Sequence, residues 1–118
     1  MTRITAVLAA AAVGALMFAA PAAPALPRLV GTVGPGFTIT LKKGGRKVTR
    51  LRAGRYAFVV TDRSGIHNFH VRGPGVNKVI TGLGFTGRKT VTLKLRPGRY
   101  TYVCDPHKPS MRGSFRVT

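Results

Sequence analysis

The sequence predicts an all-β protein, either a sandwich or a barrel, and three observations support this fold class. After residue 25, short segments rich in β-branched and aromatic residues alternate with turns rich in Gly and Pro. No helical periodicity occurs in this part of the chain. The turns are spaced closely enough that each segment between them has the length of one short strand. About eight strands are expected, over 29–33, 37–41, 47–51, 56–61, 67–72, 90–95, 100–104 and 114–118.

The first 25 residues are expected to be a secretory signal peptide that precedes the folded domain. They contain one basic residue, Arg3, an Ala-rich apolar run over 4–20, and Ala23-Pro24-Ala25, which fits a small-x-small cleavage site. The run is short for a membrane-spanning helix, and Ala contributes little to insertion. We therefore expect one exported domain over 26–118, periplasmic, secreted or at the cell surface, with no membrane span after signal removal.

The charge of the chain is strongly one-sided. It has 20 Lys and Arg against two acidic residues, Asp62 and Asp105, and a formal net charge of +18. Paired-carboxylate catalysis would have to use these two acids, and calcium or magnesium sites have almost no ligands to draw on. The shortage of acids thus removes these options, and the chain is not expected to be an enzyme. Its partners are expected to be acidic, whether nucleic acid, envelope polyanions that it binds weakly or an acidic redox protein.

The basic run KKGGRKVTR, over 42–50, predicts a hairpin with a Gly-Gly turn that carries cations on both arms. Such a hairpin suits polyanions, and it also fits a solvated edge strand, because edge lysines block pairing between sheets. No aromatic residues interleave with the cations to stack bases. Specific binding of nucleic acid is therefore not expected.

Two segments of the chain resemble each other. LRAGRYAFVV over 51–60 and LRPGRYTYVC over 95–104 share the pattern LR-x-G-R-Y. This echo predicts two equivalent hairpin arms, one in each sheet. The Gly-rich segment 73–88 is expected to be a long loop with one short strand near Val79.

The scarce metal-binding residues cluster near the C-terminus. After signal removal, the single Cys of the chain, Cys104, and its one remaining Met, Met111, lie within eight residues, with His107 between them. Thiolate and thioether are soft donors that select copper, and imidazole completes the set. Structural zinc sites use four Cys or His ligands and do not usually include Met. Pro106 and Pro109 are expected to stiffen this loop before metal binds.

A fourth ligand must come from IHNFHV, which contains His67 and His70. Strand alternation places these two on opposite faces, so both cannot bind one metal without a bulge. His67 is chosen because it lies beside the RSG turn, at a sheet end, and because the amide of Asn68 could tie this loop to the Cys104 loop. His70 is expected at the surface or at a sheet edge.

HNF and YTYVCDPHKPSMRGSF together resemble the cupredoxin family, which includes plastocyanin, pseudoazurin, amicyanin and related small bacterial blue-copper proteins. The resemblance covers roughly 37–118. It implies a Greek-key sandwich with copper at one end, held by His67, Cys104 and His107 as equatorial ligands and by Met111 as the weak axial one, with Asn68 as a supporting residue. The loop reads C-x2-H-x3-M, whereas plastocyanin-like loops have four residues between His and Met and amicyanin-like loops have two.

The resemblance implies transfer of single electrons through a copper ion that alternates between Cu(I) and Cu(II), with His107 as the exposed edge of the site. Two alternatives stay open. One is a copper carrier or resistance protein with the same ligands. The other is a basic β-sandwich that binds acidic envelope polymers, in which Cys104 and Met111 are purely structural.

Overall fold

The structure, a computed structural model, describes residues 2, 5, 7–16 and 24–118. The predicted signal peptide over 1–25 therefore lies partly outside the described residues and stays a prediction. Within the described residues, no helix is long and apolar enough to cross a membrane.

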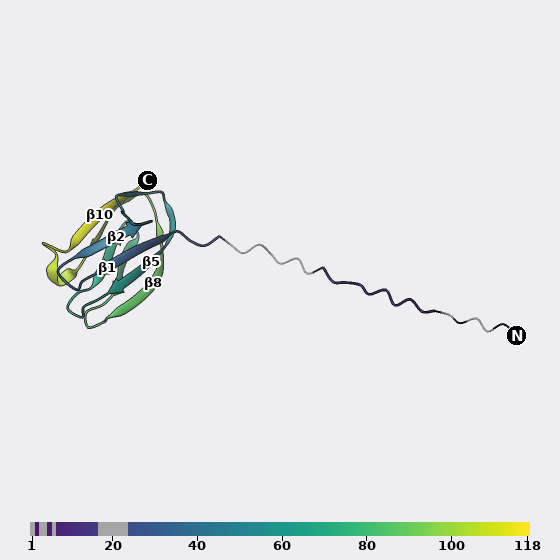
Figure 1. Cartoon of the computed structure of the whole chain (residues 1–118). Helices are drawn as coiled ribbons and strands as arrows, with labels where there is room; N and C mark the ends of the chain where they lie inside the picture. The colour runs from purple at the N-terminus through teal and green to yellow at the C-terminus, as the bar shows by residue number, and fades with distance from the viewer. Residues whose placement is uncertain (1, 3–4, 6, 17–23) are drawn as a thin grey trace.

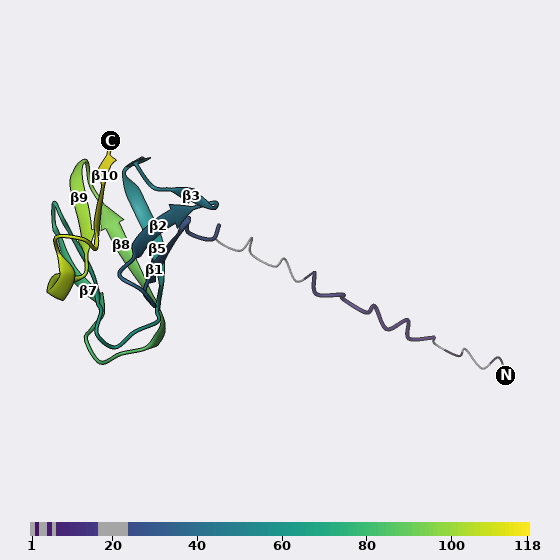
Figure 2. The same cartoon turned by 60° about the vertical axis from the view of Figure 1, so that its left-hand side comes forward.

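Residues 28–117 form two five-stranded sheets packed face to face (Figures 1 and 2). Sheet A has the order β3-β2-β1-β5-β8 and sheet B the order β4-β10-β9-β6-β7. The strands are β1 Arg28–Val33, β2 Ile39–Lys43, β3 Arg46–Lys47, β4 Arg50–Leu51, β5 Gly54–Asp62, β6 Phe69–Gly73, β7 Val76–Thr81, β8 Gly87–Leu95, β9 Gly98–Val103 and β10 Arg112–Val117. In the described part of the chain the one helical element is the 3-10 turn η1, Asp105–His107.

The chain crosses repeatedly between the two sheets, so half of the neighbouring strand pairs within the sheets are not consecutive in sequence. Both sheets are mixed, because β1 pairs with β5 and β4 pairs with β10 in parallel, whereas the other pairs are antiparallel. The predicted all-β Greek-key sandwich is confirmed, with ten strands in place of about eight. The predicted cationic hairpin is also present, with Gly44 and Gly45 both at positive φ between β2 and β3.

Two differences from the predicted strands account for the larger number. The expected strand over 47–51 is two short strands, β3 and β4, which belong to different sheets. The predicted short strand near Val79 is present as β7, but the rest of 73–88 is not one long loop, because β6 ends at Gly73, β8 begins at Gly87 and β7 pairs with β6 along its length. Only the last two residues of β7 are buried, because β7 lies at the edge of sheet B, so its sequence lacks the apolar alternation of a half-buried strand.

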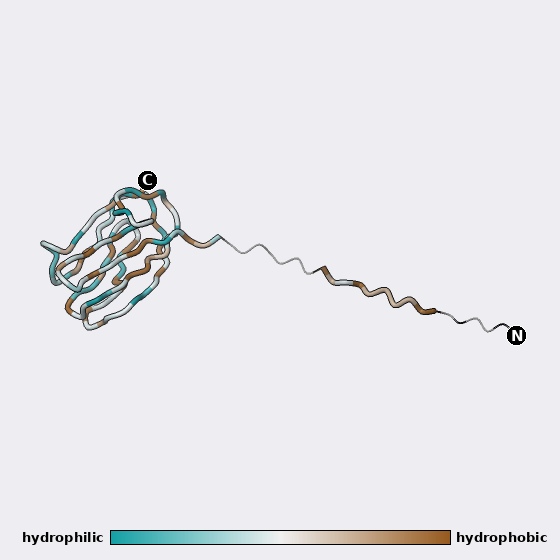
Figure 3. Tube along the Cα trace, in the orientation of Figure 1, coloured by the Kyte–Doolittle hydropathy of each residue, from teal (hydrophilic) through white to brown (hydrophobic). Residues whose placement is uncertain are grey.

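Apolar side chains from both sheets fill the space between them, and the hydropathy alternates along the strands (Figure 3). Every strand except the exposed β3 contributes its inward-facing positions, as the period of two in a strand requires. The fully buried large side chains include Leu29, Leu41, Phe58, Phe69, Leu95, Tyr100, Tyr102 and Met111. A close-packed core of this kind holds the strand ends in fixed positions. A metal site at one end of the sheets needs ligands that are fixed in this way.

The echo LR-x-G-R-Y corresponds to one structural device used twice. Tyr56 at the start of β5 donates a hydrogen bond to the carbonyl of Arg52 at 2.7 Å, and Tyr100 at the start of β9 donates one to the carbonyl of Arg96 at 2.8 Å. The two strands lie in different sheets, as predicted, but only β9 is an arm of a hairpin, because β5 pairs with β1 and β8, which are not its neighbours in sequence. Each tyrosine fixes the turn that leads into the strand, in the manner of a tyrosine corner. In β9 this strand leads directly to Cys104.

We expect Tyr56→Phe and Tyr100→Phe each to lower the free energy of unfolding by about 1 kcal/mol, because each leaves a turn carbonyl without its donor. Urea unfolding of the single and double variants measures this. Tyr102→Phe is the control, since the Tyr102 hydroxyl makes no hydrogen bond to the described residues, and it should change stability less. Equal losses in all three variants would contradict the assignment of a special role to the two turn tyrosines.

Candidate metal centre

The loop that joins β9 to β10 carries most of the predicted ligands. Cys104 follows the last residue of β9 and Met111 precedes the first residue of β10, so the hairpin itself fixes both. The Cys104 amide donates to the Met111 carbonyl at 3.0 Å, and the Met111 amide donates to the His107 carbonyl at 2.8 Å. These bonds fold the eight residues into a compact loop in which Pro106 lies in the turn η1.

The fourth predicted ligand comes from another part of sheet B. His67 lies just before β6, and β6 pairs with β9, so the start of one strand lies beside the end of the other. The turn that precedes β6 is closed by a bond from the His67 amide to the carbonyl of Ser64 at 3.1 Å. The pairing of two strands distant in sequence therefore brings the HNF motif to the Cys104 loop.

Three donor atoms meet at this end of the sandwich. The Nδ1 atoms of His67 and His107 are 3.2 Å apart, and Cys104 Sγ lies 3.6 Å from the first and 3.4 Å from the second. In the described part of the chain, these residues are the one group of three or more His, Cys, Asp or Glu that could hold a metal. The centre of such a triangle is about 2 Å from each corner, which is close to the length of metal–imidazole and metal–thiolate bonds. The donors therefore fit a metal ion.

A backbone carbonyl fixes the tautomer of His67. Its Nε2 lies 3.0 Å from the carbonyl oxygen of Gly36, which can only accept a hydrogen bond, so Nε2 carries the proton. In a neutral imidazole the other nitrogen, Nδ1, then has a free lone pair, and this atom faces Cys104 and His107. A second partner of this kind is typical of histidines that bind metals.

The segment that provides Gly36 also covers the site. The Phe37 ring meets the His67 ring at 5.5 Å and the His107 ring at 4.9 Å, both edge-on, although 60% of Phe37 is exposed. Gly34 has a φ of +74°, and a Cβ there would lie 3.3 Å from the ring of His67. Sequence reasoning did not identify Gly36 or Phe37 as site residues and placed Phe37 in a strand, whereas β2 begins at Ile39.

Asn68 and Asp105 form a reciprocal pair that links the two loops. The Asp105 amide donates to Asn68 Oδ1 at 2.7 Å, and Asn68 Nδ2 donates to Asp105 Oδ2 at 2.8 Å. Each residue is the sequence neighbour of a donor, because Asn68 follows His67 and Asp105 follows Cys104. The pair therefore fixes the separation of these two donors.

His70 is part of the same network, and the prediction of a surface or edge position is wrong. Its side chain is buried, with Nδ1 2.8 Å from Asp105 Oδ2 and Nε2 hydrogen-bonded to Asn77 of β7. Strand alternation does place it on the outer face of sheet B, but Asp105 and Asn77 cover it there. Asp105 lies in the turn that follows β9 and not in a strand. The alternation of residues along β6 therefore could not indicate that Asp105 covers His70.

The electrostatics of the network favour an ionised Asp105. Burial alone would raise the pKa of its carboxyl group, but hydrogen bonds from Asn68 and His70 and the positive charges of His70 and Lys108 hold the pKa below its ordinary value. Burial also raises the pKa of the Tyr102 phenol. Asp105 is thus kept as a charged acceptor that can hold both Asn68 and His70.

The chemistry of the donor set is specific. Two imidazoles and a thiolate in one plane, with a thioether nearby, are typical of blue-copper sites. Cys104 and Met111 are completely buried and His67 is too, whereas His107 is partly exposed. The structure thus gathers the three predicted nitrogen and sulfur donors, and it buries Met111 at the end of the same loop.

We expect Asp105→Asn to lower the free energy of unfolding of the metal-free protein at neutral pH by roughly 1–3 kcal/mol, because hydrogen bonds to a charged acceptor are lost. The folded pKa is below the unfolded value of about 3.9, so the contribution of Asp105 is complete above that value and is lost as the pH falls through the folded pKa. Urea unfolding of the parent and of Asp105→Asn between pH 3 and 7 measures this. The difference between their free energies of unfolding should shrink below about pH 4. A difference that stays constant down to pH 3 would contradict this account.

Comparison with known proteins agrees with this geometry. The profile of the family described as copper binding proteins, plastocyanin/azurin family, matches residues 38–118. Among solved structures, reduced rusticyanin is similar at 24% identity, with a TM-score of 0.57 over 77% of this chain and 78% of the other. A second structure, described as the copper protein rusticyanin, gives 19% identity and a TM-score of 0.57 over 77% and 76%.

Rusticyanin from Thiobacillus ferrooxidans is also similar, at 24% identity and a TM-score of 0.50 over 77% of this chain and 76% of that one. At these identities the likeness of structure shows the fold alone. A search of curated proteins finds no match. The family profile covers more than two thirds of the chain, including every predicted ligand. The chain belongs to the plastocyanin/azurin family of copper-binding proteins, and its cofactor is copper.

Proposed function

We propose that this protein is an exported type 1 copper protein that carries single electrons between redox partners. His67, Cys104 and His107 would hold the metal in a plane, Met111 would be the weak axial ligand, and Asn68 would support the arrangement. Copper bound in this way accepts and releases one electron at a time. Electron carriers of this kind are not enzymes, and no catalytic residue is assigned.

The observation that carries the proposal is the triangle of donor atoms with edges of 3.2 to 3.6 Å. If the grouping of Cys, His and Met were accidental, nothing would direct the unprotonated nitrogen of His67 toward the other two donors. Here the Gly36 carbonyl holds the proton on the far nitrogen, and the lone pair faces the other two donors. This arrangement supports metal binding by the folded chain without a change of tautomer.

Burial and hydrogen bonding favour electron transfer over copper delivery. Cys104 and Met111 are inaccessible to water, and the Asn68–Asp105 pair fixes the loops before metal binds. A carrier that hands its ion to an acceptor must expose its ligands, whereas an electron carrier benefits from ligands that do not move. His107 is the partly exposed member of the set, so a partner that approaches this end meets its imidazole beside Phe37.

We expect one equivalent of Cu(II) to give domain 26–118 an intense thiolate-to-copper band in the visible and a narrow copper hyperfine splitting in the EPR spectrum. Both follow from a covalent Cys104 thiolate bond in a trigonal site. Cys104→Ser should abolish the band, and His67→Ala should abolish it or convert it to a different spectrum. Absorption and EPR titrations measure this.

The matched control is Ser110→Ala, an exposed change in the same loop, which should keep the spectrum of the parent. A colourless copper complex of the parent would refute the electron-carrier proposal. A different result would be that the parent loses Cu(I) to a soluble chelator as rapidly as a weak complex does. That result would favour the alternative of a copper carrier with the same ligands.

Export is expected to remove residues 1–25. When the full chain is made in a bacterial host with a Sec pathway, the mature protein should begin at Leu26 and be found outside the cytoplasm. Mass spectrometry of the fractions measures the cleavage point. Ala25→Arg should block cleavage, because the site requires a small residue. Recovery of the intact chain from the cytoplasm would contradict the expectation.

A further inference from the structure

The outer face of sheet B is cationic in a way that opposes its own stability. Arg99 on β9 pairs directly with Arg116 on β10, and Arg116 pairs with Arg50 on β4. All three side chains are exposed. Like charges that lie directly opposite across strands destabilise a sheet. The fold therefore keeps three arginines in one row despite their repulsion.

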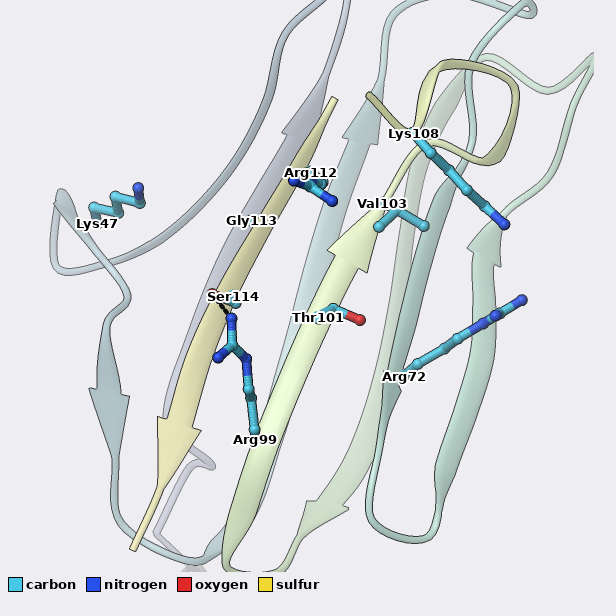
Figure 4. A pocket seen from close by; sticks show the side chains of 9 residues that line it. All are labelled: Lys47, Arg72, Arg99, Thr101, Val103, Lys108, Arg112, Gly113 and Ser114. Atoms are coloured by element: carbon cyan, nitrogen blue, oxygen red, sulfur yellow. Dashed lines mark hydrogen bonds between the residues drawn. The ribbon is translucent and has the colours of Figure 1, made fainter. Parts of the chain in front are cut away.

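Next to this row the same face has a groove of about 540 Å³ (Figure 4). Its floor is neutral and consists of Thr101 and Val103 on β9 and Gly113 and Ser114 on β10. Five cations surround the floor, namely Lys47, Arg72, Arg99, Lys108 and Arg112. Lys108 and Arg112 directly follow His107 and Met111, so one end of the groove is the copper loop itself.

The chain has almost no negative charge to offset these cations. Asp62 is buried on β5, in the other sheet, and Asp105 is held by Asn68 and His70. The one ion pair among the groove cations in the described residues is a long contact of 3.9 Å between Lys108 and Asp105. Arg72, Arg99 and Arg112 have no acidic partner within the described part of the chain.

We infer that this groove is the docking site for the acidic face of a folded protein that exchanges electrons with the copper. The inference rests on the proposed electron-carrier function and adds where the partner binds. Three guanidinium groups suit carboxylates, which they can bind through two parallel hydrogen bonds.

The anatomy of the groove favours a folded protein over a linear polyanion. Protein interfaces have a less charged centre and a charged rim, and here four neutral residues are surrounded by five cations. A polymer bound by counter-charge alone needs a stripe of cations and no floor. From Val103 to Arg99 the strand rises about 13 Å, so a partner that covers the groove also lies against the copper loop.

The test uses a plant-type [2Fe–2S] ferredoxin, a strongly acidic one-electron carrier, as the probe. Amide shifts of the ¹⁵N-labelled, Cu(I)-loaded protein are followed as oxidised ferredoxin is added at low salt. The parent is compared with Arg99→Gln/Arg116→Gln. The control is Arg55→Gln/Lys94→Gln, which removes an equally exposed pair of opposed cations from β5 and β8 of sheet A. Both double variants lose two positive charges. Both should fold, because each removes a repulsive pair of exposed cations that lie opposite each other.

We expect the sheet B variant to raise the dissociation constant for ferredoxin roughly tenfold and the sheet A variant to change it much less. The shifted amides should lie on β6, β9, β10 and the Cys104–Met111 loop. In stopped-flow experiments, reduced ferredoxin gives one electron to the Cu(II) protein. The rate constant of this transfer should fall more in the sheet B variant than in the sheet A variant.

Equal losses in the two variants would overturn the inference, because they would show that net charge alone steers the partner. Retention on a heparin column should drop equally in both variants. A drop confined to the sheet B variant, with unchanged ferredoxin binding, would assign the groove to linear polyanions and overturn the inference. Failure of the proposed function is a separate result, namely the absence of the blue band in the parent.

Discussion

The metal centre depends on the pair of hydrogen bonds between Asn68 and Asp105. His67 and Cys104 lie 37 residues apart in sequence, and each is at the end of a strand where pairing stops. The amide of Asn68 both accepts from the backbone and donates to the carboxylate of Asp105, so it holds the position and the orientation of the loop at once. His70 then holds the carboxylate from the side of the sheet.

Around this link the rest of the sandwich acts as a rigid support. Tyr100 fixes the turn at the far end of β9, and the core packs Tyr100 and Tyr102 between the sheets. Cys104 follows these residues directly, so its side chain is placed by strand pairing and core packing together. A donor held in this way needs little reorganisation when the charge of a bound metal changes.

Much of the fold and the site could be predicted because the informative residues are local. Cys104, His107 and Met111 lie within eight residues, and their type alone indicates soft-metal chemistry. The contacts that were missed join distant segments. Gly36 acts through a backbone carbonyl, which any residue has. Phe37 stays 60% exposed, and only the tertiary fold shows that its ring meets two imidazoles edge-on. Only the last two residues of β7 are buried, so its sequence lacks the pattern that reveals buried strands.

The shortage of acidic residues has a consequence for encounters between identical molecules. With one acid buried and the other hydrogen-bonded to Asn68 and His70, almost all the charges that two copies of the protein present to each other are positive. Their mutual repulsion acts over a Debye length of about 8–10 Å near physiological salt. Under the proposed electron-carrier function, this repulsion would slow electron self-exchange and favour encounters with unlike, acidic molecules.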